Sequence, residues 1–178
     1  MSKLILTGAP GAGKTALLLA LESRGFAVVR EAATDVIALD QARGVDEPWL
    51  DARFIDQIVR LQVRRENGST AVGRVLFDRS PVCTLALARY LGFQPPSALQ
   101  DELDRILKGD IYCRKVLLIE PIGFITHTDA RRITYDESLR FGQLHIEAYR
   151  EFGFELLSVP PNPIDDRVKT IQAMIEAL

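Results

Sequence analysis

Cysteine, histidine and tryptophan are scarce in this sequence of 178 residues, which contains two, two and one of them respectively. Two cysteines are too few for a disulfide scaffold, so we expect Cys83 and Cys113 to be free thiols in a reducing compartment. No apolar run reaches the roughly 18–20 residues that a transmembrane helix needs. Positive charge is not in excess, since 22 Lys and Arg face 24 Asp and Glu, a formal charge of −2. This balance argues against attachment to duplex nucleic acid or anionic lipid by bulk positive charge.

The composition that remains is that of an ordinary globular protein. Apolar residues make up 47% of the chain and charged residues 26%, which supplies enough apolar material for one full core. No repeat, low-complexity tract or linker divides the sequence, so we expect a single domain over residues 1–178. The apolar stretch within Met1–Gly8 is too short for a signal peptide. We therefore expect a cytoplasmic protein whose partners include neither a membrane nor a nucleic acid.

Short β-type runs alternate with longer helical patterns along the whole chain. This alternation predicts an α/β fold in which a five-stranded parallel sheet is covered by helices on both faces. The predicted strands are Lys3–Thr7, Ala27–Arg30, Val75–Phe77, Val116–Ile119 and Glu155–Val159. The predicted helices are Lys14–Arg24, Glu31–Ala42, Pro48–Glu66 with Asp46 as its N-cap, Pro81–Leu91, Ser97–Lys108, a helix from a Thr134/Glu137 capping box to about Glu151, and a last helix capped by Asn162 with Pro163 in its first position.

Residues 8–15 form the most informative motif, Gly-Ala-Pro-Gly-Ala-Gly-Lys-Thr, which matches the phosphate-binding loop pattern without a mismatch. Glycines let successive backbone N–H groups turn toward phosphate oxygens, and the positive end of the following helix adds to the attraction. We expect Lys14 to reach the β- and γ-phosphates of a nucleoside triphosphate and the Thr15 hydroxyl to ligate Mg²⁺. The residues predicted to hold the triphosphate are Gly8, Ala9, Pro10, Gly11, Ala12, Gly13, Lys14, Thr15 and Ala16.

Charged side chains follow the second and third predicted strands, at the edge where parallel sheets bind ligands. Asp78 is predicted to hold Mg²⁺ directly or through water, and Arg79 to bind phosphate or a substrate oxyanion. Glu31 is placed to accept a proton from an attacking hydroxyl. Two alternatives stay open, because Asp78 can instead cap the next helix, and Glu31 can be an acid that the helix dipole favours.

The stretch over residues 123–135 has no clean helical or strand period and carries Asp129, Arg131 and Arg132. We interpret it as a lid loop. Cations on such a loop can neutralise the charge that develops during phosphoryl transfer and exclude water from the site. The alternative is a solvated surface patch.

The phosphate loop, Glu31, the run Asp78-Arg79-Ser80 and the run Asp129-Ala130-Arg131-Arg132 together make the chain resemble, from end to end, the small P-loop families labelled "AAA domain". These families look like nucleoside-type kinases, and the resemblance extends to nicotinamide riboside kinase domains and, more remotely, to deoxynucleoside kinases. In deoxynucleoside kinases a Glu after the second strand is the base for the acceptor hydroxyl, which implies that role for Glu31. Those enzymes have Glu-Arg-Ser where this chain has Asp78-Arg79-Ser80.

The same resemblance implies further site residues. Related small kinases carry Asp-Gly-x-Arg in the lid, and this chain departs from it by having Ala130 in place of Gly, so that Arg132 matches the lid arginine better than Arg131. The loop that contacts adenine corresponds to Pro160-Pro161-Asn162-Pro163, and its implied contacts are Asn162 and Pro163. In deoxynucleoside kinases, aromatic and Gln side chains of a long helix hold the acceptor base. The residues that this implies for substrate binding here are Trp49, Arg53 and Gln57, beside Glu31 and Arg79.

These features favour a P-loop kinase that uses ATP and Mg²⁺ to phosphorylate a small, nucleoside-like hydroxyl acceptor. Its predicted catalytic residues are Lys14, Glu31, Asp78, Arg79 and Arg132. One alternative is a P-loop ATPase in which Glu31 orients water, and another is an ATP-binding regulatory module with negligible turnover. A Ras-type GTPase and an ABC ATPase are not expected, since neither Asn-Lys-x-Asp nor Leu-Ser-Gly-Gly occurs in the sequence.

Overall fold

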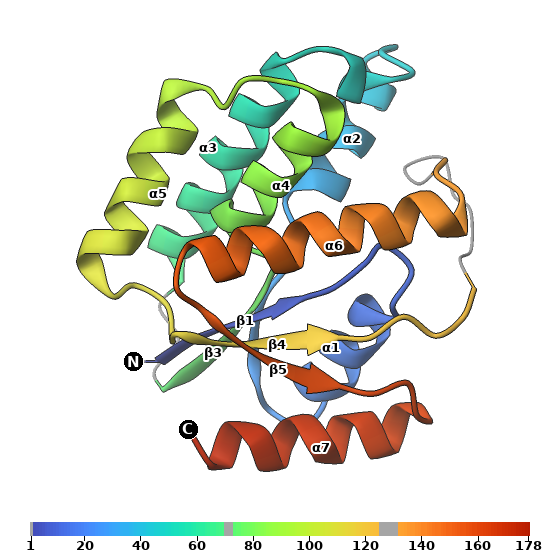
Figure 1. The fold of residues 1–178 in the computed structure, drawn as a ribbon, viewed down its shortest axis with the longest axis vertical. Helices are drawn as coiled ribbons and strands as arrows, with labels where there is room; N and C mark the ends of the chain where they lie inside the picture. The colour runs from blue at the N-terminus through green and yellow to red at the C-terminus, as the bar shows by residue number, and fades with distance from the viewer. Residues whose placement is uncertain (1, 70–72, 125–131) are drawn as a thin grey trace.

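Strands and helices alternate along the chain in the computed structural model, which describes residues 2–69, 73–124 and 132–178 (Figure 1). The strands are β1 (Ser2–Thr7), β2 (Ala27–Val29), β3 (Arg74–Asp78), β4 (Lys115–Ile119) and β5 (Glu155–Val159). The helices are α1 (Lys14–Glu22), α2 (Ala33–Ala42), α3 (Arg53–Gly68), α4 (Pro81–Leu91), α5 (Ser97–Gly109), α6 (Tyr135–Glu151) and α7 (Ile164–Glu176), with a short 3-10 turn η1 (Pro48–Leu50) before α3.

The strands form one parallel sheet in the order β2-β3-β1-β4-β5, which confirms the predicted five-stranded parallel sheet. The order changes direction at β1, which has β3 on one side and β4 on the other. In open α/β sheets, ligands bind outside the carboxyl ends of the strands at such a point. Leu6 pairs with Asp78 and Val29 pairs with Phe77. The segments that follow β1, β2 and β3 therefore meet at one edge of the sheet.

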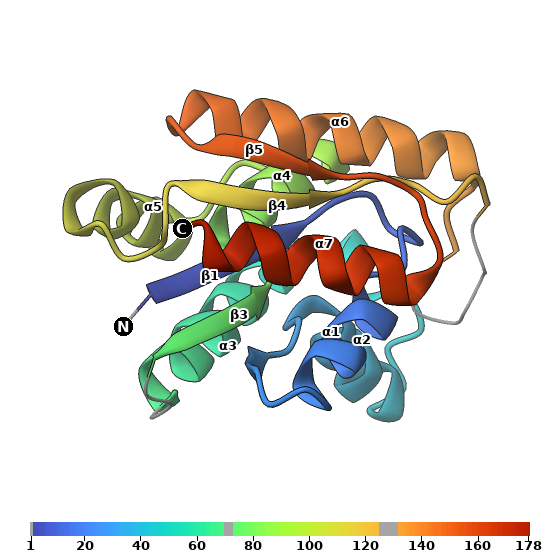
Figure 2. The ribbon, with the colours of Figure 1, turned by 90° about the horizontal axis from the view of Figure 1, so that it is seen from below.

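Alternate residues of the central strands face two different helical layers, because successive side chains of a strand point to opposite faces. Ile5 of β1 and Val75 of β3 pack with residues of α3, α4, α5 and α6. Leu4 and Leu6 of β1 and Leu76 of β3 pack instead with α1 and α7. Figures 1 and 2 show α1 and α7 on one side of the sheet and the larger group of helices on the other. Both faces of the sheet are thus covered, as predicted.

The predicted helix over Pro48–Glu66 is wrong in its first part, where the chain forms η1 and only then α3. Asp51 separates the two with an extended backbone, at φ −102° and ψ 128°. Its carboxylate accepts a hydrogen bond from the N–H of Arg53 (2.8 Å). An Asp side chain that competes for a backbone N–H in this way interrupts helical turns. This later start decides which side chains of α3 face the candidate site.

Other element ends differ less from the predictions. The capping box of α6 is confirmed, since the Glu137 N–H donates to Thr134 Oγ1 (3.3 Å) and the Thr134 N–H donates to Glu137 Oε2 (2.7 Å). The last helix starts at Ile164 with Pro163 as its N-cap residue, so the predicted cap at Asn162 is off by one position. Helix α2 starts at Ala33, which leaves Glu31 in the connection after β2.

Only the two ends of the predicted lid can be compared with the structure. Residues 125–131 lie outside the described residues, and residues 123–124 and 132–134 belong to no helix or strand. Helix α6 begins directly after them, at Tyr135. The described ends of the lid segment therefore agree with the predicted loop.

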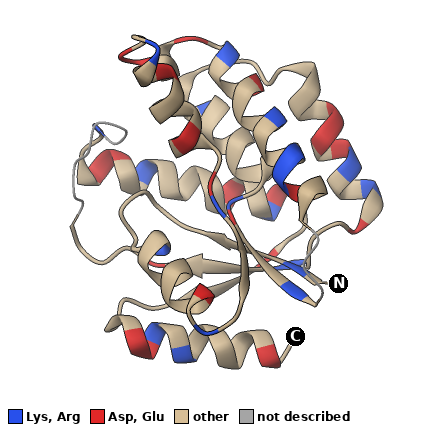
Figure 3. Cartoon of the chain, turned by 180° about the vertical axis from the view of Figure 1, so that it is seen from behind, with Lys and Arg blue, Asp and Glu red and all other residues tan. Residues whose placement is uncertain are grey.

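Charged residues of both signs are interspersed along the helices in the view of Figure 3. Some form pairs one helical turn apart, such as Arg60 with Asp56 (2.6 Å) on α3 and Lys108 with Asp104 (2.9 Å) on α5. Over the described ranges, no helix is both long and apolar enough to cross a membrane.

A buried carboxylate ties together the amino-terminal edge of the sheet. Glu66 of α3 exposes only 2% of its side chain and accepts hydrogen bonds from Lys3 Nζ (2.8 Å), Arg105 Nη2 (2.7 Å) and the Tyr112 hydroxyl (3.0 Å). Burial alone would raise the pKa of Glu66, but the hydrogen bonds from Lys3 and Arg105 hold it below the usual value. One ionised side chain therefore joins β1, α3, α5 and the segment before β4.

We expect Glu66→Gln to lower the free energy of unfolding by about 1–3 kcal/mol, because it removes one partner from a buried charge cluster whose cations keep partial contact with water. Urea denaturation at neutral pH measures this change. The loss should shrink as the pH falls through the lowered pKa of Glu66, since the carboxylate is then protonated in the wild type as well.

The matched control is Asp104→Asn, which breaks the pair with Lys108 on the exposed side of α5. Surface pairs of this kind contribute about 0.5 kcal/mol or less. Equal destabilisation by the two substitutions would contradict the role assigned to Glu66.

Candidate active site

A cavity of about 760 Å³ lies at the carboxyl edge of the sheet. It is lined by the phosphate loop, by the segments that follow β2 and β3, and by residues of α3, α4 and α6. Stretches far apart in the sequence thus contribute to one cavity. The predicted site residues that line it are Pro10, Gly11, Gly13, Lys14, Thr15, Ala16, Glu31, Trp49, Asp78, Arg79 and Arg132.

The phosphate loop follows a path that requires glycine. Gly8 and Gly13 have φ angles of 141° and 85°. A Cβ at Gly8 would lie 2.3 Å from the carbonyl oxygen of Ile119, at the end of β4. No carbonyl among the described residues accepts a hydrogen bond from the backbone N–H of Gly13, Lys14 or Thr15. These donors, at the positive N-terminus of α1, suit an anion.

Lys14 is buried and points back into its own loop, where Nζ donates to the carbonyls of Gly8 (3.2 Å) and Ala9 (3.1 Å). Burial, together with the positive charge of Arg79, lowers the pKa of Lys14 to about 8. An ammonium group held this way gains from an incoming anion, which favours its charged form.

Glu31 and Arg79 form an ion pair, in which Arg79 Nε lies 2.6 Å from Glu31 Oε1. The other carboxylate oxygen of Glu31 accepts a hydrogen bond from Thr34 Oγ1 (2.8 Å), and Arg65 of α3 donates to the Glu31 carbonyl. Burial alone would raise the pKa of Glu31, but the positive charges of Arg79 and Lys14 hold it below the usual value. Glu31 is therefore an ionised carboxylate that keeps 25% of its side chain exposed at the cavity.

The backbone of Arg79 adopts a φ of 70°, a conformation that non-glycine residues rarely take. Its N–H donates to the carbonyl of Leu6 (3.0 Å), which ties the residue to β1. Arg79 Nη1 lies 3.2 and 3.0 Å from the two ring nitrogens of His145 on α6. Burial, with the positive charges of Arg79 and Lys14, lowers the pKa of His145 well below its usual value, so the ring is neutral. Strained backbone held by several contacts is typical of functional sites.

Asp78 and Thr15, the predicted metal ligands, both line the cavity. Asp78 Oδ1 is buried, and no hydrogen-bond partner for it occurs among the described residues, an arrangement that suits a cation. The part of the chain that the structure describes holds no group of three or more His, Cys, Asp or Glu residues able to bind a metal alone. Mg²⁺ usually takes one or two protein ligands and completes its shell with water and substrate phosphates. The two residues fit Mg²⁺ that arrives with a nucleotide.

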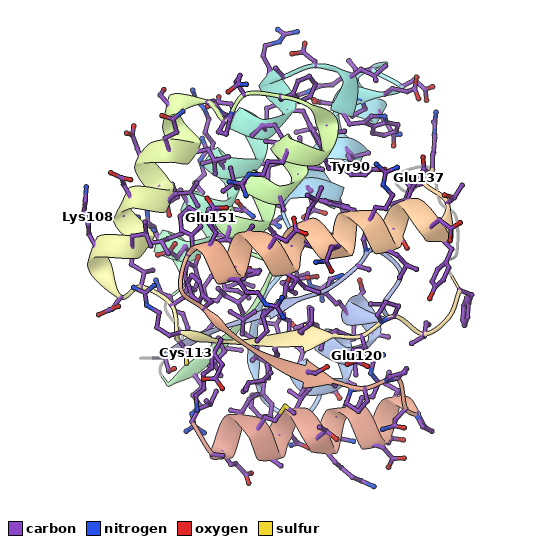
Figure 4. The ribbon with its side chains drawn as sticks, in the orientation of Figure 1. Tyr90, Lys108, Cys113, Glu120, Glu137 and Glu151 are labelled. Atoms are coloured by element: carbon purple, nitrogen blue, oxygen red, sulfur yellow. The ribbon has the colours of Figure 1, made fainter. Side chains whose placement is uncertain are left out.

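The other end of the cavity is apolar and aromatic. Tyr90 of α4 stacks on Phe141 of α6, with ring centroids 4.8 Å apart, and Figure 4 shows Tyr90 beside α6 toward the end that carries Glu137. Gln62 of α3 adds a side-chain amide, whose oxygen accepts a hydrogen bond from Thr84 Oγ1 (2.9 Å). Such a pocket fits a flat ring with a polar edge. Its further apolar lining consists of Ile37, Trp49, Phe54, Ile58, Leu87 and Leu91.

Two predicted acceptor residues, Arg53 and Gln57, do not line the cavity. Side chains four residues apart share one face of a helix, and the face of α3 that lines the cavity carries Phe54, Ile58 and Gln62. The sequence reasoning missed Gln62 because it compared turns from a helix start at Pro48, ahead of the true start of α3. Counting forward from Phe54 in steps of four would have found it.

Arg132, the predicted lid cation, lines the cavity at its rim. Its Nη2 lies 2.7 Å from Asp46 Oδ1, and its guanidinium lies 5.5 Å from the centre of the Trp49 ring. Asp46 thus pairs with Arg132, and it does not cap a helix as predicted. The hydrogen bond from Arg132 holds the pKa of Asp46 below the usual range.

The remaining predicted nucleotide contacts lie elsewhere. Arg131 is outside the described residues. Asn162 and Pro163 are exposed just before α7 and do not line the cavity. The sequence also gave no sign that α6 rests on the phosphate loop, where a Cβ at Gly142 would lie 3.0 Å from Ala9 Cβ. This packing is what brings His145 to the site.

Comparisons with known proteins identify the family and the fold of this chain. A family model described as "AAA domain" matches residues 3–167. No curated protein matches the chain. The fold is similar to deoxyadenosine kinase from M. mycoides with the products dCMP and a flexible dCDP bound, at a TM-score of 0.66 and 11% identity over 99% of this chain and 100% of that one.

Two further structures of the same kinase are similar as well. The one with bound dATP has a TM-score of 0.62 at 11% identity and covers 98% of this chain and 99% of its own. The one with bound dCTP has a TM-score of 0.63 at 11% identity and covers 99% and 100%. The chain therefore has the fold of P-loop deoxynucleoside kinases.

The environment of Asp78 leads to a prediction about stability. Burial and the negative charge of Glu31 raise the pKa of Asp78 to about 6. A carboxyl with a raised pKa stabilises the fold while it is protonated, and that stability is lost as the pH rises from the unfolded value of about 4 through about 6. We expect Asp78→Asn to raise the free energy of unfolding by about 1–3 kcal/mol at neutral pH, because it removes a negative charge that is destabilised by burial.

Urea denaturation of both proteins across this pH range measures the effect. The two stabilities should be similar in acid and diverge as the wild type ionises. Parallel pH profiles for wild type and Asp78→Asn would contradict the raised pKa.

The lowered pKa of Lys14 predicts how anion binding depends on pH. Above a pH of about 8 a growing share of Lys14 is neutral, so the affinity for inorganic tripolyphosphate should fall as the pH rises through this value. Calorimetric titration at a series of pH values checks this. Lys14→Arg keeps its charge throughout and should show no such fall. A wild-type affinity that is flat across the same range would contradict the lowered pKa of Lys14.

Proposed function

Because the chain belongs to this AAA-domain family and has the fold of P-loop kinases, we propose that it is an ATP- and Mg²⁺-dependent kinase for a small, nucleoside-like hydroxyl acceptor. The observation that carries the proposal is the Glu31–Arg79 ion pair (2.6 Å). Both residues line the one cavity that also holds the phosphate loop and the aromatic pocket. The Glu31 carboxylate therefore lies in the cavity that would hold both the donor phosphate and the acceptor ring.

The donor binds through residues 8–16. Lys14 exchanges its two carbonyl partners for the β- and γ-phosphates, and the backbone N–H groups at the start of α1 take up phosphate oxygens. Thr15 and Asp78 hold Mg²⁺, which when bound neutralises charge on the phosphates. We keep Asn162 and Pro163 as proposed contacts of the adenine ring. Arg131 and Arg132 are the proposed lid contacts of the ATP phosphates.

The transfer step moves one phosphoryl group and one proton. The acceptor oxygen forms a bond to the γ-phosphorus, the bond from that phosphorus to the bridging oxygen breaks, and ADP leaves. The acceptor proton passes to Glu31, which the pair with Arg79 keeps ionised and aimed at the cavity until then. Arg79 offers its positive charge to the transferred phosphoryl group.

The acceptor occupies the aromatic end of the cavity. A planar base packs among Trp49, Tyr90 and Phe141, and its polar edge meets the amide of Gln62. The deoxynucleosides and nucleotides named with the similar kinase structures are of this chemical class. Gln62 replaces Gln57 in this proposal because it lines the cavity.

Release of ADP from Mg·ATP tests the proposal, first alone and then with a panel of nucleosides, nicotinamide riboside, vitamins and amino alcohols. We expect ADP release to depend on one class of acceptor and a phosphorylated product to appear. Acceptor-independent release would instead identify an ATPase, and tight binding without release would identify a regulatory module.

Glu31→Gln should bind ATP as the wild type does and slow transfer by about 100-fold or more, because the amide cannot take the proton. Glu22→Gln is the matched control, since Glu22 is an exposed carboxylate on α1 that pairs with Arg30 (3.0 Å). Transfer by Glu31→Gln at the control rate would remove Glu31 from the role of base.

A further inference from the structure

Arg167 lies against the outside of the phosphate loop. It belongs to the first turns of α7, and only 3% of the residue is exposed. Its Nη1 donates to the carbonyl of Ala12 (3.0 Å) and its Nη2 donates to the carbonyl of Glu120 (3.0 Å). Figure 4 shows Glu120 between the end of β4 and α7. The guanidinium therefore joins α7, β4 and the phosphate loop without lining the cavity.

Packing of α7 alone does not explain a buried guanidinium. Its neighbours Val168 and Ile171 already bury an apolar face against the sheet. A charge placed beside them is costly, and Arg167 Nε has no hydrogen-bond partner among the described residues. Burial accordingly lowers the pKa of Arg167. An apolar side chain would hold α7 at a smaller cost, so the contact with the loop needs another explanation.

The peptide bond between Ala12 and Gly13 supplies that explanation. No peptide bond in the described structure is cis, so the Ala12 carbonyl and the Gly13 N–H point in opposite directions. Arg167 holds the carbonyl from the side away from the cavity, and the N–H of Gly13 is thereby directed toward the cavity that Gly13 lines. A cation on the carbonyl also polarises the peptide and strengthens its N–H as a donor.

Gly13 lies directly beside the guanidinium of Arg167. A Cβ on Gly13 would lie 3.5 Å from Arg167 Nη1, in ordinary van der Waals contact. Gly13 is also the residue that precedes α1, in a left-handed conformation with φ 85° and ψ 14°. The peptide that Arg167 holds is therefore the one at which the loop turns into the helix.

We propose that Arg167 is a positioning residue for donor binding, which fixes the Ala12–Gly13 peptide so that its N–H meets a phosphate of the triphosphate. This inference rests on the proposed function for the identity of the donor. It adds that part of the affinity for the phosphates comes from α7, outside the cavity. Arg167 acts through the loop backbone and touches no substrate.

Calorimetric titration with inorganic tripolyphosphate and with Mg·ATP tests this in wild type, Arg167→Gln and Arg167→Lys. We expect Arg167→Gln to weaken tripolyphosphate binding about tenfold, since a charge-assisted hydrogen bond that orders the donor is lost. The affinity of Arg167→Lys should lie between those of the wild type and Arg167→Gln, because a single ammonium group cannot bind both carbonyls. In the kinase assay the KM for Mg·ATP should rise, while the KM for the acceptor should not.

Arg24→Gln is the matched control. Arg24, in the turn after α1, also contacts α7, through Gln172 (2.9 Å) and Asp165 (3.1 Å), but it does so at the surface. Arg24→Gln should bind tripolyphosphate with wild-type affinity even if its melting temperature falls. Arg167→Gln with wild-type affinity would overturn the inference and reduce Arg167 to a residue that docks α7.

A measurement on the wild type covers the case in which Arg167→Gln does not fold. On saturation with tripolyphosphate, the amide proton of Gly13 and the Nη1 protons of Arg167 should both shift in NMR spectra, while the Nη2 protons facing Glu120 stay in place. A shift of Gly13 alone would overturn the inference. Failure of the wild type to bind tripolyphosphate would overturn both the role of Arg167 and the proposed function. Binding with acceptor-independent turnover would overturn the kinase function only and leave the role of Arg167 in place.

Discussion

Charge compensation around the phosphate loop is the constraint on which the rest of the site depends. Two cations, Lys14 and Arg79, and the carboxylate of Asp78 are buried there, and Glu31, with 25% of its side chain exposed, pairs with Arg79. The four groups come from three segments, because Asp78 ends β3 and Arg79 follows it directly, and the parallel order of β2, β3 and β1 brings those segments to one edge. Two buried cations without a carboxylate would be too costly, so Lys14 and Arg79 require the ionised Glu31 beside them.

This balance also explains why the proposed reaction needs additional cations. A triphosphate adds several negative charges to a set that is already neutral, and Lys14 with Arg79 cannot compensate them all. Mg²⁺ on Asp78 and an arginine from the lid would supply the difference. In the present structure Arg132 is paired with Asp46 and rests on Trp49, at the rim of the acceptor pocket. Its move to the phosphates would therefore be an exchange of anionic partners.

The parts of the protein that could be predicted are those that short stretches of sequence determine. The glycines of residues 8–15 determine the turns of the phosphate loop locally. Thr134 and Glu137 likewise determine where α6 starts, within four residues. The sheet followed from the alternation of strands and helices. In contrast, Gln62, His145 and Arg167 depend on how α3, α6 and α7 pack, which no local pattern reveals. The first part of the predicted helix Pro48–Glu66 was wrong because one hydrogen bond, from the Arg53 N–H to the Asp51 side chain, outweighed the helical spacing.

The two arginines of the cavity differ in how strongly they are shielded from water. Arg132 and Asp46 keep 41% and 74% of their side chains exposed, whereas Arg79 keeps 9%. Dissolved ions screen exposed pairs over about 8 Å at physiological ionic strength but act much less on buried ones. Salt concentration therefore acts on the two halves of the site separately. It loosens the pair of Arg132 with Asp46 at the rim, while Glu31 stays paired with Arg79.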